Sequence, residues 1–275
     1  MVLSKEQTAL LDKLCKFLSS IRGTDKVLMV KRASLKRTKN NVIPPRREAD
    51  MKLPPPQPPM QLYSYFSKVI VLRLQARDPN SLLATRLKNL AAPVSDTRIL
   101  LRYYGLIPLV QWIIFSERNP PATPFLRLVY RLQNLANLCY YPLEHLYYLG
   151  AHKVVPMSDD TLNRVGIWSC RFWAAYVMLY FLQLYQEHRL LQVRQLKLIQ
   201  RGKSNSESKE ALRAEQRSVS EDMQALLVNT IINTAYLPLT LHWSVEKSVF
   251  PEMGVGICGS VAAVAQMYSA WKSTV

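Results

Sequence analysis

A glycine-rich run near the end of the chain has the spacing of a nucleotide-binding loop. Gly254, Gly256 and Gly259 fit the pattern Gly-x-Gly-x-x-Gly, in which the backbone approaches a pyrophosphate at the start of a helix. That chemistry also needs a following strand and a carboxylate for the ribose, and only 16 residues come after Gly259. We therefore expect no nucleotide cofactor. The spacing of Gly256 with Ser260, and of Gly259 with Ala263, instead favours close helix packing in a membrane.

The histidines and cysteines do not form a catalytic or metal-binding pattern. The histidines are widely spaced and have no neighbouring carboxylate in a metal or triad arrangement, and the cysteines are scattered without paired spacing. No Gly-x-Ser-x-Gly elbow or Cys-His signature marks a nucleophile. We therefore predict that the chain is not an enzyme and binds neither a metal nor a cofactor. The residues considered are His145, His152, His188, His242, Cys15, Cys139, Cys170 and Cys258.

The composition predicts a helical protein that binds an acidic partner. Hydrophobic residues make up 49% of the chain, whereas glycine, common in the turns of β and α/β folds, occurs only 8 times. The net charge of +17 calls for either nucleic acid or an anionic membrane surface. Residues 1–110 hold 20 of the 36 Lys and Arg and 7 of the 19 Asp and Glu, so most of the positive charge lies there.

The basic run at residues 31–52 has several interpretations: a solvated disordered arm, a targeting signal read by a receptor, or a patch for lipid or nucleic acid. Nucleic acid is the least favoured, because the run lacks the interleaved aromatic residues of single-strand binders and any recognisable reading motif. We expect an anionic phospholipid membrane as the partner and no nucleic acid.

Patterns of charge, proline and hydrophobicity divide the chain into eight segments. They predict an all-α membrane protein with N-terminal amphipathic helices and about two hydrophobic membrane segments. The segments are an amphipathic helix (1–30), a disordered basic and proline-rich stretch (31–61), an amphipathic region (62–110), a helical middle region (111–165), a candidate transmembrane helix (166–186), a charged linker (187–222), an interfacial or membrane helix (223–250) and a hydrophobic helix (254–272).

Residues 166–186 are the strongest membrane candidate, because they are mostly apolar and rich in Trp and Tyr. Arg171 interrupts them, and a cation at the bilayer centre costs at least ~2.5 kcal/mol, so it must snorkel or face water. Residues 254–271 are barely long enough to cross. A further apolar face in the middle region requires a partner surface. It consists of Phe125, Leu128, Leu132, Leu135, Cys139 and Leu146.

An amphipathic helix is predicted over residues 81–104, with Ser81 as its N-cap and Pro93 as a kink or a break. Apolar residues follow each other at helical spacing, and basic residues lie beside them, as in helices that bind a lipid interface. The alternative is an ordinary helix packed into a protein core. The candidate lipid-binding residues are Leu83, Arg86, Leu87, Lys88, Leu90, Val94, Arg98, Leu101 and Arg102.

Several dispersed pieces of the chain resemble the peroxin-eleven family of peroxisomal membrane elongation factors, in the same order. Two features depart from the family pattern: residues 31–61 stand as an insertion between the first two helices, and Tyr-Tyr-Gly at 103–105 stands where the family tends to place more basic residues. The similar pieces are residues 11–18, 23–26, 65–70, 84–90, 96–102 and 254–271.

The resemblance implies a protein of the peroxisomal membrane that self-associates, elongates and tubulates the membrane before fission, and helps to recruit the organelle fission machinery. It implies membrane remodelling by residues 62–110. It also permits an alternative, a pore or transporter for small metabolites with Arg171 facing water. A third reading is a soluble basic adaptor with buried apolar helices. This reading is disfavoured by the composition and by the length of the apolar segments.

Overall fold

The computed structural model describes residues 58–121, 123–203, 209–248 and 250–274. Within these ranges the chain forms seven α-helices and one 3₁₀ turn, with no strand, which confirms the predicted all-helical fold. The predicted first helix, at residues 1–30, and nearly all of the basic stretch, at 31–61, lie outside the described residues.

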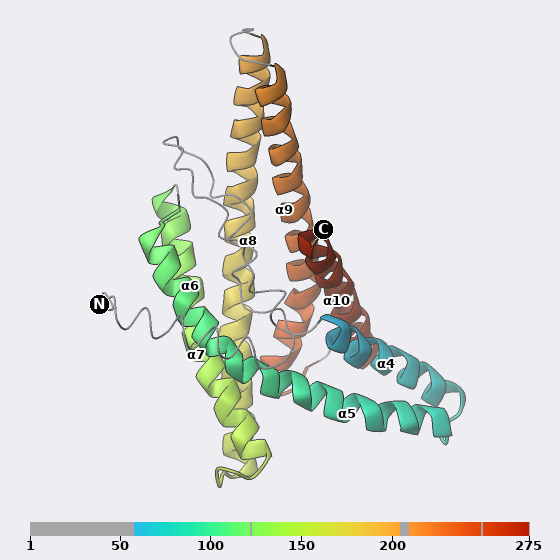
Figure 1. The fold of residues 1–275 in the computed structure, drawn as a ribbon. Coiled ribbons are helices and arrows are strands. Elements are labelled where there is room, and N and C mark those ends of the chain that lie inside the picture. Colours follow the sequence, from blue (N-terminus) through green and yellow to red (C-terminus); the bar gives the residue numbers. More distant parts are fainter. Residues whose placement is uncertain (1–57, 122, 204–208, 249, 275) are drawn as a thin grey trace.

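Helices α4 (Pro58–Arg77) and α5 (Leu82–Arg102) form the hairpin that projects to the right in Figure 1. Ser81 is the N-cap of α5, as predicted, because its side chain accepts a hydrogen bond from the backbone N–H of Ala84. Pro93 lies inside α5 and does not divide it: the helix continues to Arg102. Both halves, on either side of the proline, pack against α4.

A 3₁₀ turn (Tyr103–Gly105) leads from α5 into α6 (Leu106–Arg118), which lies beside α7 (Pro124–Ala151). Helix α7 begins where the Thr123 side chain accepts a hydrogen bond from the N–H of Leu126, at 3.2 Å.

Helices α8 (Asp159–Lys203) and α9 (Lys209–Trp243) form a long antiparallel hairpin. Their 45 and 35 residues correspond to about 68 and 53 Å of helix. The charged segment predicted as a linker, 187–222, is helical on both sides of residues 204–208.

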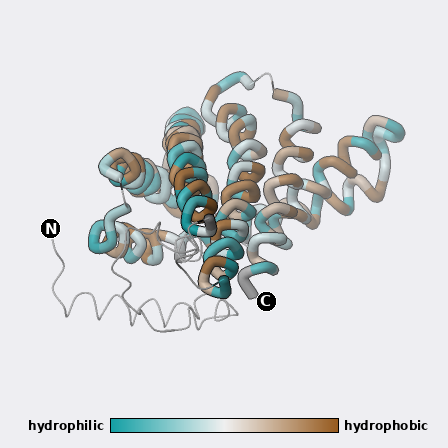
Figure 2. The backbone as a smooth tube through the Cα atoms, turned by 90° about the horizontal axis from the view of Figure 1, so that it is seen from above, coloured by the Kyte–Doolittle hydropathy of each residue, from teal (hydrophilic) through white to brown (hydrophobic). Residues whose placement is uncertain are grey.

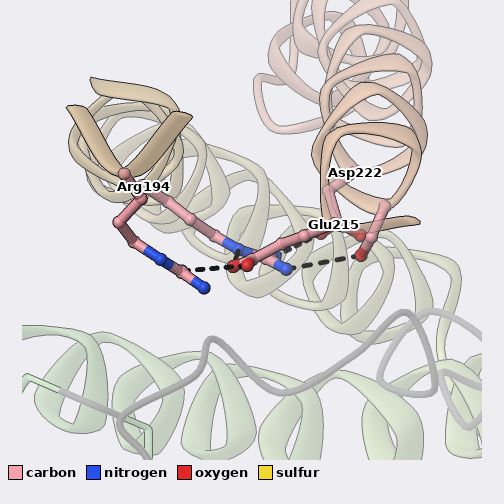
Figure 3. Close-up of polar contacts among 5 residues, drawn as sticks. Arg194, Glu215 and Asp222 are labelled. Atoms are coloured by element: carbon pink, nitrogen blue, oxygen red, sulfur yellow. Dashed lines mark hydrogen bonds and ion pairs between the residues drawn. The ribbon is translucent and has the colours of Figure 1, made fainter. Parts of the chain in front are cut away.

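Ion pairs across this hairpin explain why its charged part remains helical. Arg194 of α8 lies 3.1 Å from Asp222 and 3.5 Å from Glu215 of α9, and Arg201 also pairs with Glu215, at 3.0 Å (Figure 3). These contacts join oppositely charged residues that are far apart in the sequence. The charged segment is therefore a pair of helices that hold each other together.

Helix α10 (Glu252–Thr274) packs against both α9 and α4, so the packing order is α6, α7, α8, α9, α10, α4, α5. Seen from above, hydrophobic positions recur along the outer helices and do not gather at one centre (Figure 2). By length and composition, 159–202 and 252–272 are each able to cross a membrane. Helices α5 and α6, bent by 43°, form a third candidate if they act as one span.

Candidate membrane-binding surface

The first half of α5 presents apolar and basic side chains to its surroundings. Leu83 and Leu90 are 56% and 55% exposed, and Arg86 and Lys88 are also exposed. Leu87 is half-buried, because this edge of the stripe turns toward α4, where Ala84 is buried. Leu83, Leu90 and Arg86 therefore share one exposed face of this half, and Lys88 is exposed further round the helix.

The second half of α5 uses the same residue types for contacts inside the protein. Arg98 is only 8% exposed, and its guanidinium lies over the ring of Tyr65 of α4, 5.3 Å from the ring centroid. Arg102 forms an ion pair with Glu144 of α7 at 2.6 Å. Val94 and Leu101, which complete the predicted stripe, are half-buried. In this arrangement Arg98 and Arg102 face protein groups, and the exposed surface does not include them.

A set of polar contacts docks this second half onto α7. Asp96 lies 2.8 Å from His152 and accepts a hydrogen bond from the Tyr148 hydroxyl at 3.4 Å. The Tyr103 hydroxyl donates to the backbone carbonyl of His145 at 2.7 Å, and the two rings stack with centroids 3.9 Å apart.

Sequence reasoning did not identify these docking residues. Asp96 and Tyr103 lie on or next to the amphipathic helix, but their partners are more than 40 positions away in the chain. One usable signal was present: Glu144 is an isolated carboxylate in an otherwise apolar stretch, and such a residue needs a cationic partner when it is buried.

The small residues of α10 lie against α4. A Cβ atom on Gly256 would be 2.6 Å from Cγ2 of Val69, and one on Gly259 would overlap the ring of Tyr65. Ala263 is fully buried, and the Ser260 hydroxyl donates to the carbonyl of Gly256 at 2.7 Å. Contact between these helices is thus close enough to require residues without large side chains.

Tyr65 connects three helices. Its ring fills the space left by Gly259 of α10, and it also underlies the guanidinium of Arg98 of α5. The position of α5 is therefore tied through α4 to α10, which is one of the two helices that can cross a membrane. We call Tyr65, Arg98 and Gly259 the three-helix joint.

The remaining titratable residues show no catalytic arrangement in the described part of the chain. No group of three His, Cys, Asp or Glu residues there has the geometry of a metal site. The guanidinium of Arg171 lies over the ring of Trp168, 4.8 Å from its centroid, and its Nε donates to the carbonyl of Ser244 at 3.1 Å. Cys139, Cys170 and Cys258 are free thiols.

Comparisons with known proteins match most of the chain. The profile of the peroxisomal biogenesis factor 11 (PEX11) family matches residues 60–271. An uncharacterised protein of Schizosaccharomyces pombe is 25% identical over 198 residues, covering 72% of this chain and 82% of the relative. Peroxisomal membrane protein 11C of Homo sapiens is 27% identical over 217 residues, covering 74% and 83%. No solved structure matches.

Proposed function

Because the chain belongs to the peroxisomal biogenesis factor 11 family, we propose that it elongates the peroxisomal membrane by inserting the exposed half of α5 into one leaflet. Family membership confirms the resemblance recognised in the sequence, and it places the chain in the peroxisomal membrane. The family is one of non-enzymatic biogenesis factors, in agreement with the predicted lack of catalytic residues.

The observation that carries the proposal is the exposure of Leu83 and Leu90 beside Arg86 and Lys88. Burying one leucine side chain contributes about 1.5–3 kcal/mol. Each cation near an anionic surface contributes about 1 kcal/mol. Two leucines and two cations on one half-helix are enough to hold that half among the lipid headgroups.

The docked half of α5 determines which part of the helix can insert. Arg102 and Asp96 hold the end of the helix to α7, so only the first half is free to enter the leaflet. Added volume in one leaflet and none in the other favours curvature. Self-association of protomers would concentrate these wedges, and recruitment of the fission machinery would follow; both remain proposals drawn from the family resemblance.

The test uses the full chain in cells whose own gene has been deleted. We expect Leu83→Asp with Leu90→Asp to remove the elongation of peroxisomes that overexpression of the unchanged chain produces. Losing the burial of two leucines weakens binding by at least about 3 kcal/mol, which is more than a hundredfold. The measurement is organelle length under a peroxisomal membrane marker.

The matched control is Thr85→Asn, which leaves the charge unchanged at an exposed position on the opposite face of the same helix from the leucines. It should leave elongation unchanged. If the double-aspartate variant reaches the peroxisomal membrane and elongates the organelles as well as the control does, insertion of α5 is not the mechanism.

We do not extend the proposal to a pore. Arg171, the cation that the pore alternative places in water, is an exposed residue, and its guanidinium also contacts the Trp168 ring and the Ser244 carbonyl. The cavity between α6, α7 and α8 has a volume of about 30 Å³, whereas an open groove of about 580 Å³ lies between α8 and α9, beside His188, Ile199 and Met223. Small-molecule sites usually measure about 300–1,000 Å³, so the cavity between α6, α7 and α8 has room for water and not for a metabolite.

A further inference from the structure

We infer that α7 and α9 accompany α8 through the bilayer, and that the outward leucine face of α7 contacts lipid acyl chains. By length and composition α8 and α10 are able to cross a membrane, whereas α7 and α9 do not stand out by those measures. The inference depends on the membrane location of the chain and not on the remodelling activity proposed for α5.

The first argument is the packing of α8. On one side its predicted span contacts α7: Gln183 accepts a hydrogen bond from Gln133 at 2.9 Å, and Ser169 contacts the carbonyl of Tyr140 at 3.5 Å. On the other side, the ring of Trp173 lies 5.8 Å from that of Trp243 of α9. Helix α7 thus flanks most of the predicted span, and α9, which ends at Trp243, flanks its later part, so both helices enter the same hydrocarbon layer as α8.

The second argument is the reversed polarity of α7. Its buried face includes Gln133, Asn134 and Asn137 among apolar residues, while Leu132 and Leu135 on the other face are 40% and 57% exposed. A helix on the surface of a soluble protein has the opposite distribution. In a membrane, polar side chains face the bundle and bond between helices, as Gln133 does.

The third argument is the length of the part of α7 that carries no exposed charge, measured along the helix axis. On α7 no exposed charged residue lies between Arg131 and His152, all of which are described. Glu144, the one carboxylate between them, is buried against Arg102. At 1.5 Å per residue this interval is about 31 Å, the thickness of the hydrocarbon core.

On helix α10 the interval without charged residues has about the same length as on α7. Its charged residues are Glu252 and Lys272, about 30 Å apart along the helix. At the first residue of α10, Glu252 pairs with Lys68 of α4. Two helices on different sides of the molecule thus have charge-free intervals of about the thickness of one hydrocarbon slab.

Ion pairs and polar contacts mark the borders of this slab. On one border Arg131 pairs with Glu117, and the hydrogen bond from Arg131 lowers the pKa of that carboxyl. On the same side, Lys272 of α10 contacts Gln224 of α9. On α9, residues 223–241 contain no charged side chain.

Lipid explains the outward leucines better than a second copy does. Exposed apolar residues also follow the outward face of α10, where Val261 and Val264 are 44% and 54% exposed. Helices α7 and α10 lie on opposite sides of the α8–α9 hairpin (Figure 1). One partner molecule would cover a single side, whereas acyl chains surround the whole slab.

The test uses the unmodified full chain in liposomes of phosphatidylcholine and anionic phospholipid that carry a photoactivatable diazirine on the acyl chain. After irradiation, peptides are mapped by mass spectrometry. We expect adducts on α7 between residues 132 and 147 and on α9 between 227 and 241, in addition to those on α8 and α10. Labelling of α8 and α10 with none on α7 would overturn the inference.

Single-cysteine variants give a second measurement. In a chain with all four cysteines replaced by serine, Leu135→Cys is labelled with an environment-sensitive fluorophore and compared with Arg127→Cys, beyond the border. We expect lipids that carry a doxyl quencher deep in the acyl chain to quench most of the fluorescence at position 135. Iodide in the aqueous phase should quench most of the fluorescence at position 127. Iodide quenching at 135 overturns the inference.

A third outcome separates lipid from a second copy. Shielding of position 135 from both quenchers, together with disulfide cross-linking between two chains carrying Leu135→Cys, would assign the face to an interface between copies. Neither experiment depends on Leu83 or Leu90, so failure of the α5 mechanism and failure of this inference are distinguishable.

Discussion

The two halves of α5 have similar compositions and different surroundings. In the first half Arg86 and Lys88 are exposed beside leucines, whereas in the second half Arg98 lies over an aromatic ring and Arg102 is paired with Glu144. Only the first half has exposed basic residues. The comparison teaches that an amphipathic pattern predicts a helix and its faces, but the residues that pack against each half decide what a given arginine does.

Breaking the docked half should have the largest effect. Glu144→Ala leaves Arg102 beside α7 without its carboxylate, and an unpaired, largely buried cation is costly. We expect a loss of about 3 kcal/mol in stability, measured as a lower Tm of the detergent-solubilised protein.

The control is the double variant Glu144→Leu with Arg102→Met, which removes both charges. Its Tm should lie closer to that of the unchanged protein than the Tm of Glu144→Ala does. A Tm of Glu144→Ala equal to that of the unchanged chain would mean that the ion pair does not hold the second half in place.

Filling the glycine contact should have the next largest effect. In Gly259→Val the new side chain overlaps the ring of Tyr65 and disturbs the three-helix joint, and overpacking of this kind costs about 1–3 kcal/mol. We expect a lower Tm and reduced elongation of peroxisomes. Val264→Leu, at an exposed position of α10, is the matched control and should change neither.

Neutralising single cations should have the smallest effect and sharpens the comparison most directly. Arg86→Gln or Lys88→Gln in the first half removes about 1 kcal/mol of attraction to anionic vesicles, roughly fivefold in affinity, and less at high salt. Arg98→Gln in the second half should lower the Tm and leave the salt dependence of binding unchanged. Equal salt dependence for all three variants would contradict the division of α5.

Much of the fold follows from local sequence. The helical class, the Ser81 cap and the span in α8 are visible in spacing and composition. The contacts of α5 are not, because Tyr65 and Glu144 lie on other helices and no periodicity links them to Arg98 or Arg102.

The charged stretch at 187–222 illustrates the same limit. From sequence alone, each of the two charged parts of this segment is predicted to be solvated. The ion pairs of Arg194 with Glu215 and Asp222, which join the two parts as a hairpin, are visible only in the structure. Likewise, the leucine face of α7 was visible in the sequence as a surface that needed a partner, but its buried amides became informative only when Gln133 was seen to face Gln183.

The three-helix joint has a mechanical consequence. With the Tyr65 ring lodged between Gly259 and Arg98, α4 has little freedom to slide along α10. The joint therefore fixes the position of α5 relative to α4 and α10. Under the proposed mechanism, the depth that Leu83 and Leu90 reach in a leaflet therefore depends on the tilt of α10 as well as on their own affinity for lipid.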